Sequence, residues 1–176
     1  MIDLLRTRRS VRKFTEQAFE PELLELLEEA VLRSPSSKNS NACEFIFIDD
    51  HILIEKLSHC RPSGASSLDT APLAVIVLCN ENKTGAWTED CSIASILLQL
   101  TAHSFGLGSC WIQIRGRNYS EEKTSETYLR ETLDIPEYFR ILNIVAIGHP
   151  QRIPVGKPFS DLDFGRIHSN HLIPSH

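Results

Sequence analysis

The sequence predicts an α+β fold in a single domain spanning residues 1–176. A length of 176 residues suits one sizeable core. Four short apolar runs have the length and composition of strands, and the segments around them carry apolar residues at helical spacing. A hydrophobic fraction of 41% and a charged fraction of 23% are ordinary for a soluble globular protein. We find no internal repeat and no boundary that would mark a second domain.

The first third of the chain predicts three helices and one strand. Asp3 is placed to cap the first helix, and Pro21 suits the first position of the second. That second helix carries an apolar stripe on one side and glutamates on the other. The expected elements are helices over residues 4–8, 21–33 and 49–58 and a strand over residues 44–48.

The middle of the chain predicts a loop, a buried strand and a long helix. Residues 60–70 are the most loop-like stretch of the sequence. The continuous apolar run over residues 73–79 predicts a strand buried on both faces. Thr88 is placed to cap a helix that has almost no polar face, so that helix is expected in the core or in a subunit interface. The glycines of residues 106–108 are expected to end it.

The last third predicts two more strands, one helix and an extended tail. Residues 110–114 and 141–147 favour strands, and residues 121–133 form an acidic amphipathic helix that stops before Pro136. Residues 151–176 have little periodicity, and a tail of this kind is expected to wrap a partner subunit.

Bulk properties exclude several classes of protein. A net charge of −5 argues against a general nucleic-acid binder. No apolar run is long enough for a membrane span, and the N-terminus has no secretory signal. The five cysteines are odd in number and lack C-x-x-C spacing, so neither a disulfide framework nor a zinc ribbon is expected. A reduced, cytoplasmic setting fits this pattern.

A dense basic segment lies near the N-terminus of this acidic chain. Five cations fall within eight positions: Arg6, Arg8, Arg9, Arg12 and Lys13. Arginine presents a planar fork that binds phosphate through two hydrogen bonds, and Ser10 adds a hydroxyl. The segment therefore suits a phosphate-bearing ligand, although a solvated basic turn paired with glutamates accounts for it as well.

A second polar segment spans residues 34–41, where six of the eight residues are Ser or Asn. Such side chains bind backbone and ligand groups alike and tolerate unusual loop conformations. The segment suits the polar edge of a planar ligand, but it also suits a plain connection between helix and strand.

Three other patterns carry less weight. Gly106-Leu107-Gly108 precedes a strand rather than following one, so a dinucleotide-binding fingerprint is excluded. Cys43 has no second cysteine beside it, which favours a small residue entering a strand over a redox thiol. His168 and His171 have metal-compatible spacing, but no third ligand is evident, and no metal site is expected.

Five modest motifs, in matching order and spacing, resemble the FMN-dependent nitroreductase family. That family shows R-R-S-x-R-x-F, then P-S-x-x-N-x-Q-P-W, A-P before a strand, G-L-G-x-x-W and G-x-P. The corresponding segments here span residues 8–14, 35–43, 71–72, 106–111 and 148–150. The resemblance covers nearly the whole chain. It implies a mostly antiparallel central sheet flanked by helices, with a C-terminal tail wrapping the dimer partner.

The resemblance also implies roles for individual residues. Arg8, Arg9 and Ser10 would hold the FMN phosphate and ribityl chain, and Arg12 would lie by the pyrimidine end of the flavin. Further ring contacts would come from the other subunit, through Pro35, Ser36, Ser37 and Asn39. Backbone at Ile112 and Gln113 would pass the flavin N5 edge, and a tail cation, Lys157 or Arg166, would complete the phosphate site.

The implied activity is that of an FMN-dependent oxidoreductase and homodimer. Hydride would pass from NADH or NADPH through flavin N5 to a nitroaromatic, a quinone or a similar small acceptor, in ping-pong fashion and without a catalytic side chain. The alternatives are another flavin reaction on the same fold, such as dehydrogenation or dehalogenation, and a non-catalytic FMN carrier or redox sensor. Asn41-Ala42-Cys43 replaces the family's Q-P-W, which changes one wall near the flavin, so substrate preference does not transfer. The chain also lacks room for the long insert of larger members, so an open flavin face is expected.

Overall fold

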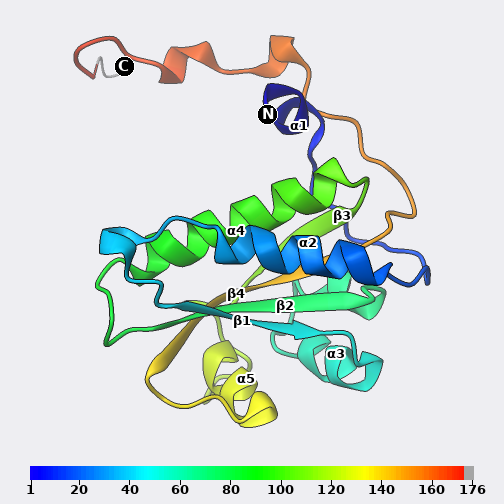
Figure 1. Cartoon of the computed structure of the whole chain (residues 1–176), viewed down its shortest axis with the longest axis vertical. Helices are drawn as coiled ribbons and strands as arrows, with labels where there is room; N and C mark the ends of the chain where they lie inside the picture. Colours follow the sequence, from blue (N-terminus) through cyan, green and yellow to red (C-terminus); the bar gives the residue numbers. More distant parts are fainter. Residues whose placement is uncertain (173–176) are drawn as a thin grey trace.

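The centre of the molecule is one antiparallel sheet with strand order β1-β2-β4-β3 (Figure 1). The computed structural model describes residues 1–172. Within that range the strands are β1 (Cys43–Ile48), β2 (Leu73–Asn80), β3 (Gly108–Gln113) and β4 (Phe139–Gly148). All three strand pairs are antiparallel, which confirms the expected α+β class and sheet. β3 is an edge strand, so one side of its backbone has no strand partner.

Helices cover both faces of this sheet (Figure 1). α2 (Pro21–Leu32) and α4 (Trp87–Ser104) pack on one face, and α3 (His51–Ser58) and α5 (Ser125–Leu133) pack on the other. Alternate residues of β2 therefore enter two different cores: Val75 and Val77 meet Leu27 and Leu98, whereas Ile76 meets the α3 and α5 side. This explains why β2 is a continuous apolar run, as expected, although its neighbours are antiparallel rather than parallel.

Three predicted helix starts are wrong. α1 (Ile2–Thr7) and α4 already include Asp3 and Thr88, and neither side chain caps its helix. Asp3 pairs instead with Arg6, at 3.0 Å. α5 begins at Ser125 rather than residue 121, because Thr124 accepts a hydrogen bond from the Thr127 amide at 3.0 Å.

Other boundaries lie at or close to the predicted residues. α2 starts at Pro21 as predicted, and α3 starts at His51, two residues after the predicted start, with Asp50 as its cap. Gly106 has a φ of +77°, the left-handed conformation that ends α4. The expected loop over residues 60–70 is well packed: it contains a short 3₁₀ helix (Ser66–Asp69) and buries Leu68.

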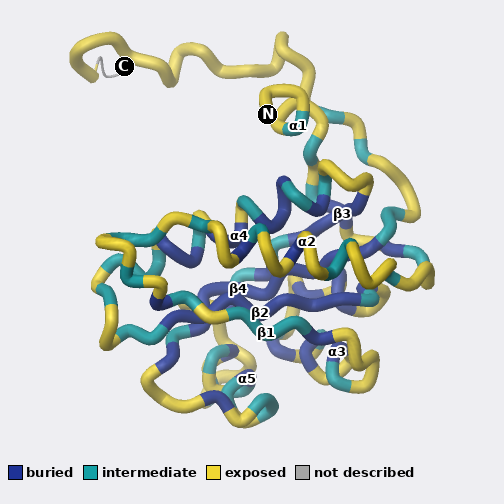
Figure 2. Tube along the Cα trace, viewed as in Figure 1, coloured by how far each residue is buried: buried dark blue, intermediate teal, exposed yellow. Residues whose placement is uncertain are grey.

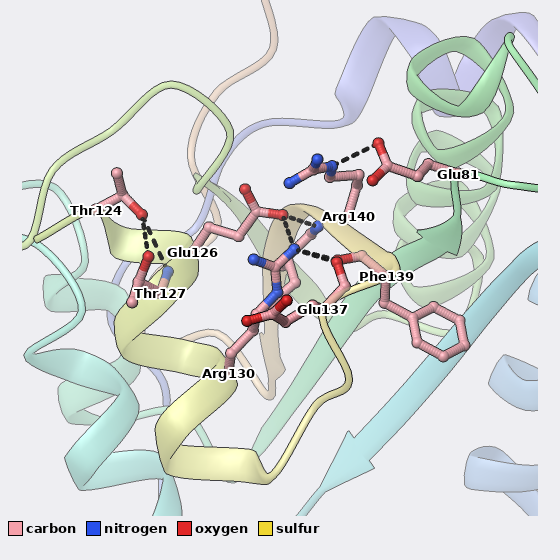
Figure 3. Close-up of polar contacts among 9 residues, drawn as sticks. Glu81, Thr124, Glu126, Thr127, Arg130, Glu137, Phe139 and Arg140 are labelled. Carbon is pink, nitrogen blue, oxygen red and sulfur yellow. Dashed lines mark hydrogen bonds and ion pairs between the residues drawn. The ribbon is translucent and has the colours of Figure 1, made fainter.

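A polar network fastens α5 to the start of β4 (Figure 3). Arg130 donates to the Glu126 carboxylate at 3.1 Å and to the carbonyls of Glu137 and Phe139. The same carboxylate accepts from the Ile141 amide at 2.9 Å. Arg140 pairs with Glu81 at 2.6 Å on the other side of the strand end. These contacts satisfy backbone groups where the sheet is not fully paired.

The C-terminal segment runs back along the N-terminal one and then leaves the body of the molecule (Figures 1 and 2). Gln151 donates to the carbonyls of Lys13 and Phe14, at 3.1 and 2.9 Å. Gly156 passes so close to α1 that a Cβ there would lie 2.0 Å from the Arg6 carbonyl oxygen. Beyond this point the described residues are exposed, including Phe159, Phe164 and Ile167. No helix in the described part of the chain is long and apolar enough to cross a membrane.

Candidate functional site

The basic N-terminal segment is tied to the open edge of β3. The Val11 amide donates to the Ser109 carbonyl at 2.9 Å, and Ser10 forms an isolated parallel bridge with Ser109. Gly108 makes this approach possible, because a Cβ there would lie 2.6 Å from the Val11 Cβ. Thr7 contacts His103 in the last turn of α4, with 2.8 Å between the hydroxyl oxygen and Nε2. The cations that flank Ser10 are therefore placed at the C-terminal end of α4.

A pocket of about 530 Å³ brings together cations from both ends of the chain. Arg8 and Arg9 line it together with Lys157, which the tail supplies after its close passage over α1. Arg6 adds a fourth cation, and the remaining wall is apolar, formed by Ile2, Leu5, Phe159 and Leu162. Three of the predicted phosphate ligands thus converge on one cavity. Arg6 was not among the predicted ligands, although it belongs to the same basic segment.

The other residues predicted to bind FMN from the N-terminal segment and the tail do not line this pocket. Ser10 and Arg12 line an adjacent pocket of about 520 Å³ with Gln151, Arg152 and residues of the tail. Arg166 lies on an exposed 3₁₀ turn (Phe164–Arg166) and does not line the pocket of Arg8, Arg9 and Lys157. Of the two tail cations, Lys157 is the one that the fold brings to the basic pocket.

The two β3 residues predicted to pass the flavin, Ile112 and Gln113, direct their backbone groups to opposite sides of the strand. The side chain of Ile112 is fully buried in the core. Because the Ser109 carbonyl points to the free edge, strand alternation directs the Gln113 backbone to that edge and the Ile112 backbone to β4. The Gln113 carbonyl accepts from Arg61 at 3.1 Å. The sequence did not predict Arg61 as a residue of this site. An Arg-Pro pair in a loop gives no indication of a contact with a residue so distant in sequence.

The Ser/Asn segment forms a compact loop at the opposite end of α4. The Ser37 amide donates to Asp90 at 2.8 Å, in the first turns of that helix, and the Ser36 hydroxyl accepts from the Asn41 amide at 3.0 Å. Asn39 has a φ of +54°, a conformation that asparagine tolerates better than most residues. Pro35 and Asn39 are exposed, and Ser36 and Ser37 are partly so.

The two polar segments of one chain are therefore far apart. His103, which contacts the N-terminal segment, and Asp90, which contacts the Ser/Asn loop, are separated by thirteen residues of helix, roughly 20 Å. Figure 1 shows the two segments at opposite ends of α4. The fold does not bring the two predicted halves of the site together within one chain.

The expectation that Cys43 lacks a nearby cysteine is wrong. Its sulfur lies 3.6 Å from that of Cys91, and Cys79 is the third member of the group. The hydrogen bond with Cys91 lowers the pKa of the Cys43 thiol. The same hydrogen bond, together with burial, raises the pKa of Cys91, and burial raises the pKa of Cys79 to about 12. Among residues 1–172, His168 and His171 take no part in any cluster of possible metal ligands.

The model of the nitroreductase family matches residues 5–71 and 60–149 of this sequence. The chain belongs to the nitroreductase family. The matched residues contain both polar segments and all four strands.

Three known proteins of similar sequence or structure can be compared with this nitroreductase-family chain. An FMN-dependent nitroreductase from Clostridium difficile is 39% identical with a TM-score of 0.96, over 98% of this chain and 100% of that one. A protein of Methanothermobacter thermautotrophicus, provisionally named an NADH dehydrogenase/NAD(P)H nitroreductase, is 33% identical over 171 residues, 96% of this chain and 85% of its own. An FMN reductase [NAD(P)H] of Bacillus subtilis is 27% identical over 90% of this chain and 69% of its own.

Proposed function

We propose that this protein is an FMN-dependent oxidoreductase that takes electrons from NADH or NADPH and reduces a small acceptor such as a quinone or a nitroaromatic. The observation that carries the proposal is the convergence of Lys157 on the pocket of Arg8 and Arg9. Like charges from the two ends of the chain repel one another when they share a cavity, so their grouping does not stabilise the fold. An anionic ligand bound between them would account for the grouping.

The pocket fits the phosphate end of FMN. Two guanidinium groups and an ammonium group can bind a phosphate dianion through charge-assisted hydrogen bonds. Their charges gain no stability from being close together unless such an anion binds between them. The nearby apolar wall of Leu5 and Leu162 suits a ligand that is only partly polar.

The free edge of β3 suits the flavin ring. The Gln113 amide is directed toward that edge and can meet the ring's polar rim, whereas the Gln113 carbonyl already accepts from Arg61. When bound, FMN would supply the two-electron chemistry, accepting hydride from the nicotinamide and returning it to the acceptor. Arg12 holds a fixed positive charge on this side of the molecule, and it favours added negative charge on a ring placed beside it.

We further propose that the site is completed in a homodimer. Pro35, Ser36, Ser37 and Asn39 lie at the wrong end of α4 to reach a ligand held by Arg8 in the same chain. A two-fold axis across α4 would bring them to the partner's site. Exposed apolar side chains on and after α4 support this arrangement: Ile93 and Ile96 are each 38% exposed and Phe105 is 48% exposed. The tail, with its exposed aromatic residues, is proposed to wrap the partner subunit. Residues 1–176 are proposed to form a single FMN-binding domain.

The five cysteines are free thiols in this structure. That pattern supports the proposal of a reducing, cytoplasmic location.

The proposal is tested on the purified protein. We expect a flavin absorbance spectrum and release of FMN, identified by chromatography after denaturation. Steady-state consumption of NADH or NADPH should depend on added quinone or nitroaromatic. Recovery of FAD, or no flavin after reconstitution, would refute the cofactor assignment. Bound FMN without NAD(P)H turnover would favour a carrier or sensor instead.

A further inference from the structure

Three cysteines from three elements meet beside the Ser/Asn loop. Cys43 begins β1 and lies opposite Cys79 of β2, and Cys91 reaches them from α4. The Asn80 amide donates to the Ala42 carbonyl at 3.1 Å, so Cys43 and Cys79 form the closer, non-hydrogen-bonded kind of cross-strand pair. Their side chains project from the same face of the sheet, toward Cys91. The three sulfur atoms all lie within 4.8 Å of one another.

This spacing is compatible with three ligands around one metal ion. Sulfur atoms at about 2.3 Å from a tetrahedral zinc ion lie roughly 3.8 Å apart. The Cys43 and Cys91 sulfurs are 3.6 Å apart, well beyond the bond length of a disulfide, about 2.0 Å. Small shifts of three side chains would therefore suffice to bind an ion.

Asp90 gives a second, independent indication of a cation. This residue precedes Cys91 and is only 3% exposed. Its Oδ1 accepts from the Ser37 amide, whereas its Oδ2 is buried without a hydrogen-bond partner. Asp90 is not one of the three possible ligands, so its contribution is negative potential beside the sulfur atoms, which favours a cation there.

An entry route leads to the cluster from the surface. A pocket of about 370 Å³ between α2 and β1 is lined by Cys43 and by two acidic residues, Glu28 and Glu44. Cys43 is partly exposed, whereas Cys79 and Cys91 are fully buried. A cation in this pocket would meet the accessible thiol of Cys43 before the buried pair.

We propose that Cys43, Cys79 and Cys91 form a binding site for one thiophilic d¹⁰ cation, with Zn²⁺ as the ion that fits best. Three thiolates are soft ligands, the kind that select zinc or copper(I) over magnesium and calcium. A divalent ion offsets more of the buried negative charge of the thiolates and Asp90 than a monovalent one does. Binding releases the three thiol protons, giving one Zn²⁺ held by three thiolates.

The experiment uses the full chain, reduced and freed of metal. Zn²⁺ is titrated against a chromophoric chelator, and Cd²⁺ is added separately to observe thiolate-to-metal charge-transfer absorption. We expect one ion per chain, with that absorption and with proton release. One Zn²⁺ bound per chain supports the choice of zinc, and no measurable Zn²⁺ binding would overturn it.

Matched variants assign the ligands. Cys43→Ser should weaken Zn²⁺ binding at least tenfold, and Cys91→Ala should do the same. Cys60→Ala and Cys110→Ala, which change the two cysteines outside the cluster, should leave it unchanged. Circular dichroism and flavin content verify that each variant is folded.

The following results would overturn the proposal. The first is the absence of thiolate-to-metal absorption in protein whose five thiols are all reduced. The second is equal affinity in the wild type and in folded Cys43→Ser. A Cys43–Cys91 disulfide in air without Zn²⁺ binding after reduction would reassign the cluster to redox chemistry. Flavin release from the same samples tests the proposed oxidoreductase separately.

Discussion

At the scale of single residues, position in this molecule is set largely by backbone contacts. Arg8 and Arg9 line a common pocket because the Val11 amide holds their segment against Ser109. Lys157 reaches the same pocket because Gly156 lets the tail touch α1. The cations themselves make few contacts within the protein, which leaves their donors available to a ligand.

Arg8→Ala is expected to weaken FMN binding at least tenfold, about 1.4 kcal/mol. The reason is the loss of one charge-assisted contact to phosphate, worth about 1.5–3 kcal/mol. Flavin fluorescence titration measures the affinity. Arg33→Ala is the control, because Arg33 pairs with Glu29 on the exposed side of α2. Equal affinities in the two variants would show Arg8 to be a solvated surface charge.

Arg12→Ala is expected to lower the midpoint potential of the bound flavin. A positive charge beside the pyrimidine end stabilises the reduced anion more than the neutral oxidised ring, so its removal makes reduction harder. Dye-coupled potentiometry on the wild type and the variant gives the sign. A potential that stays constant or rises would place Arg12 away from the ring.

At the scale of elements, the strands and helices follow from two local signals. Apolar runs such as that of β2 and breakers such as Gly106 act within a few residues, so the sequence predicts them well. Helix starts were less predictable, because Asp3, Thr88 and Thr124 all look like caps and only Thr124 accepts the capping hydrogen bond.

The cysteine cluster could not be predicted, because it depends on contacts distant in sequence. It requires the register that sets Cys43 opposite Cys79 and the packing of α4 above both. The same holds for Arg61 at the Gln113 carbonyl and for the choice of Lys157 over Arg166. The composition of the N-terminal segment predicted side chains that can bind phosphate. Which of them meet in one pocket depends on the tertiary fold.

Gly108→Ala is expected to destabilise the fold by about 1–3 kcal/mol and to weaken FMN binding. The added Cβ would lie 2.6 Å from that of Val11, so the basic segment and β3 must separate. Chemical denaturation and flavin titration measure the two effects. Gly85→Ala is the control, since a Cβ there has open space around it. A destabilisation no larger than in the control would mean that the backbone adjusts freely.

Arg130→Met is expected to destabilise the protein by about 2 kcal/mol or more. The change removes the Arg130 donor from two carbonyls and from the Glu126 carboxylate, which keeps only the Ile141 amide, at a site where the Arg130 and Glu126 side chains are 16% and 21% exposed. Urea unfolding of the variant gives the free-energy difference. Arg33→Met, at a solvated pair on α2, should change it by less than about 0.5 kcal/mol. Similar losses in both variants would argue against the network around α5.

At the scale of the whole molecule, the proposed site is divided between the two ends of α4. One chain offers the basic pocket at one end and the Ser/Asn loop at the other. The exposed Ile93 and Ile96 lie between them on the helix. In a symmetric dimer, each site would combine the basic pocket of one chain with the Ser/Asn loop of the other. The dimer would therefore contain two equivalent sites.

Mixing two defective variants is expected to restore about half of the FMN sites in a mixed dimer. Arg8→Ala removes a contact at one end of α4, and Asn39→Gly removes one at the other while keeping the positive φ. In the mixed dimer one site carries both defects and the other carries none. Flavin titration before and after subunit exchange measures this. No recovery in a verified mixed dimer would show that Arg8 and Asn39 of the same chain serve one site.

The division of the site across α4 also has a consequence for how a newly made chain matures. In the proposed arrangement a lone chain would bind the phosphate without enclosing the ring, so loading with cofactor would have to wait for a second copy. The rate of holoenzyme formation should then rise with the square of chain concentration at low expression and become first order once dimerisation is complete.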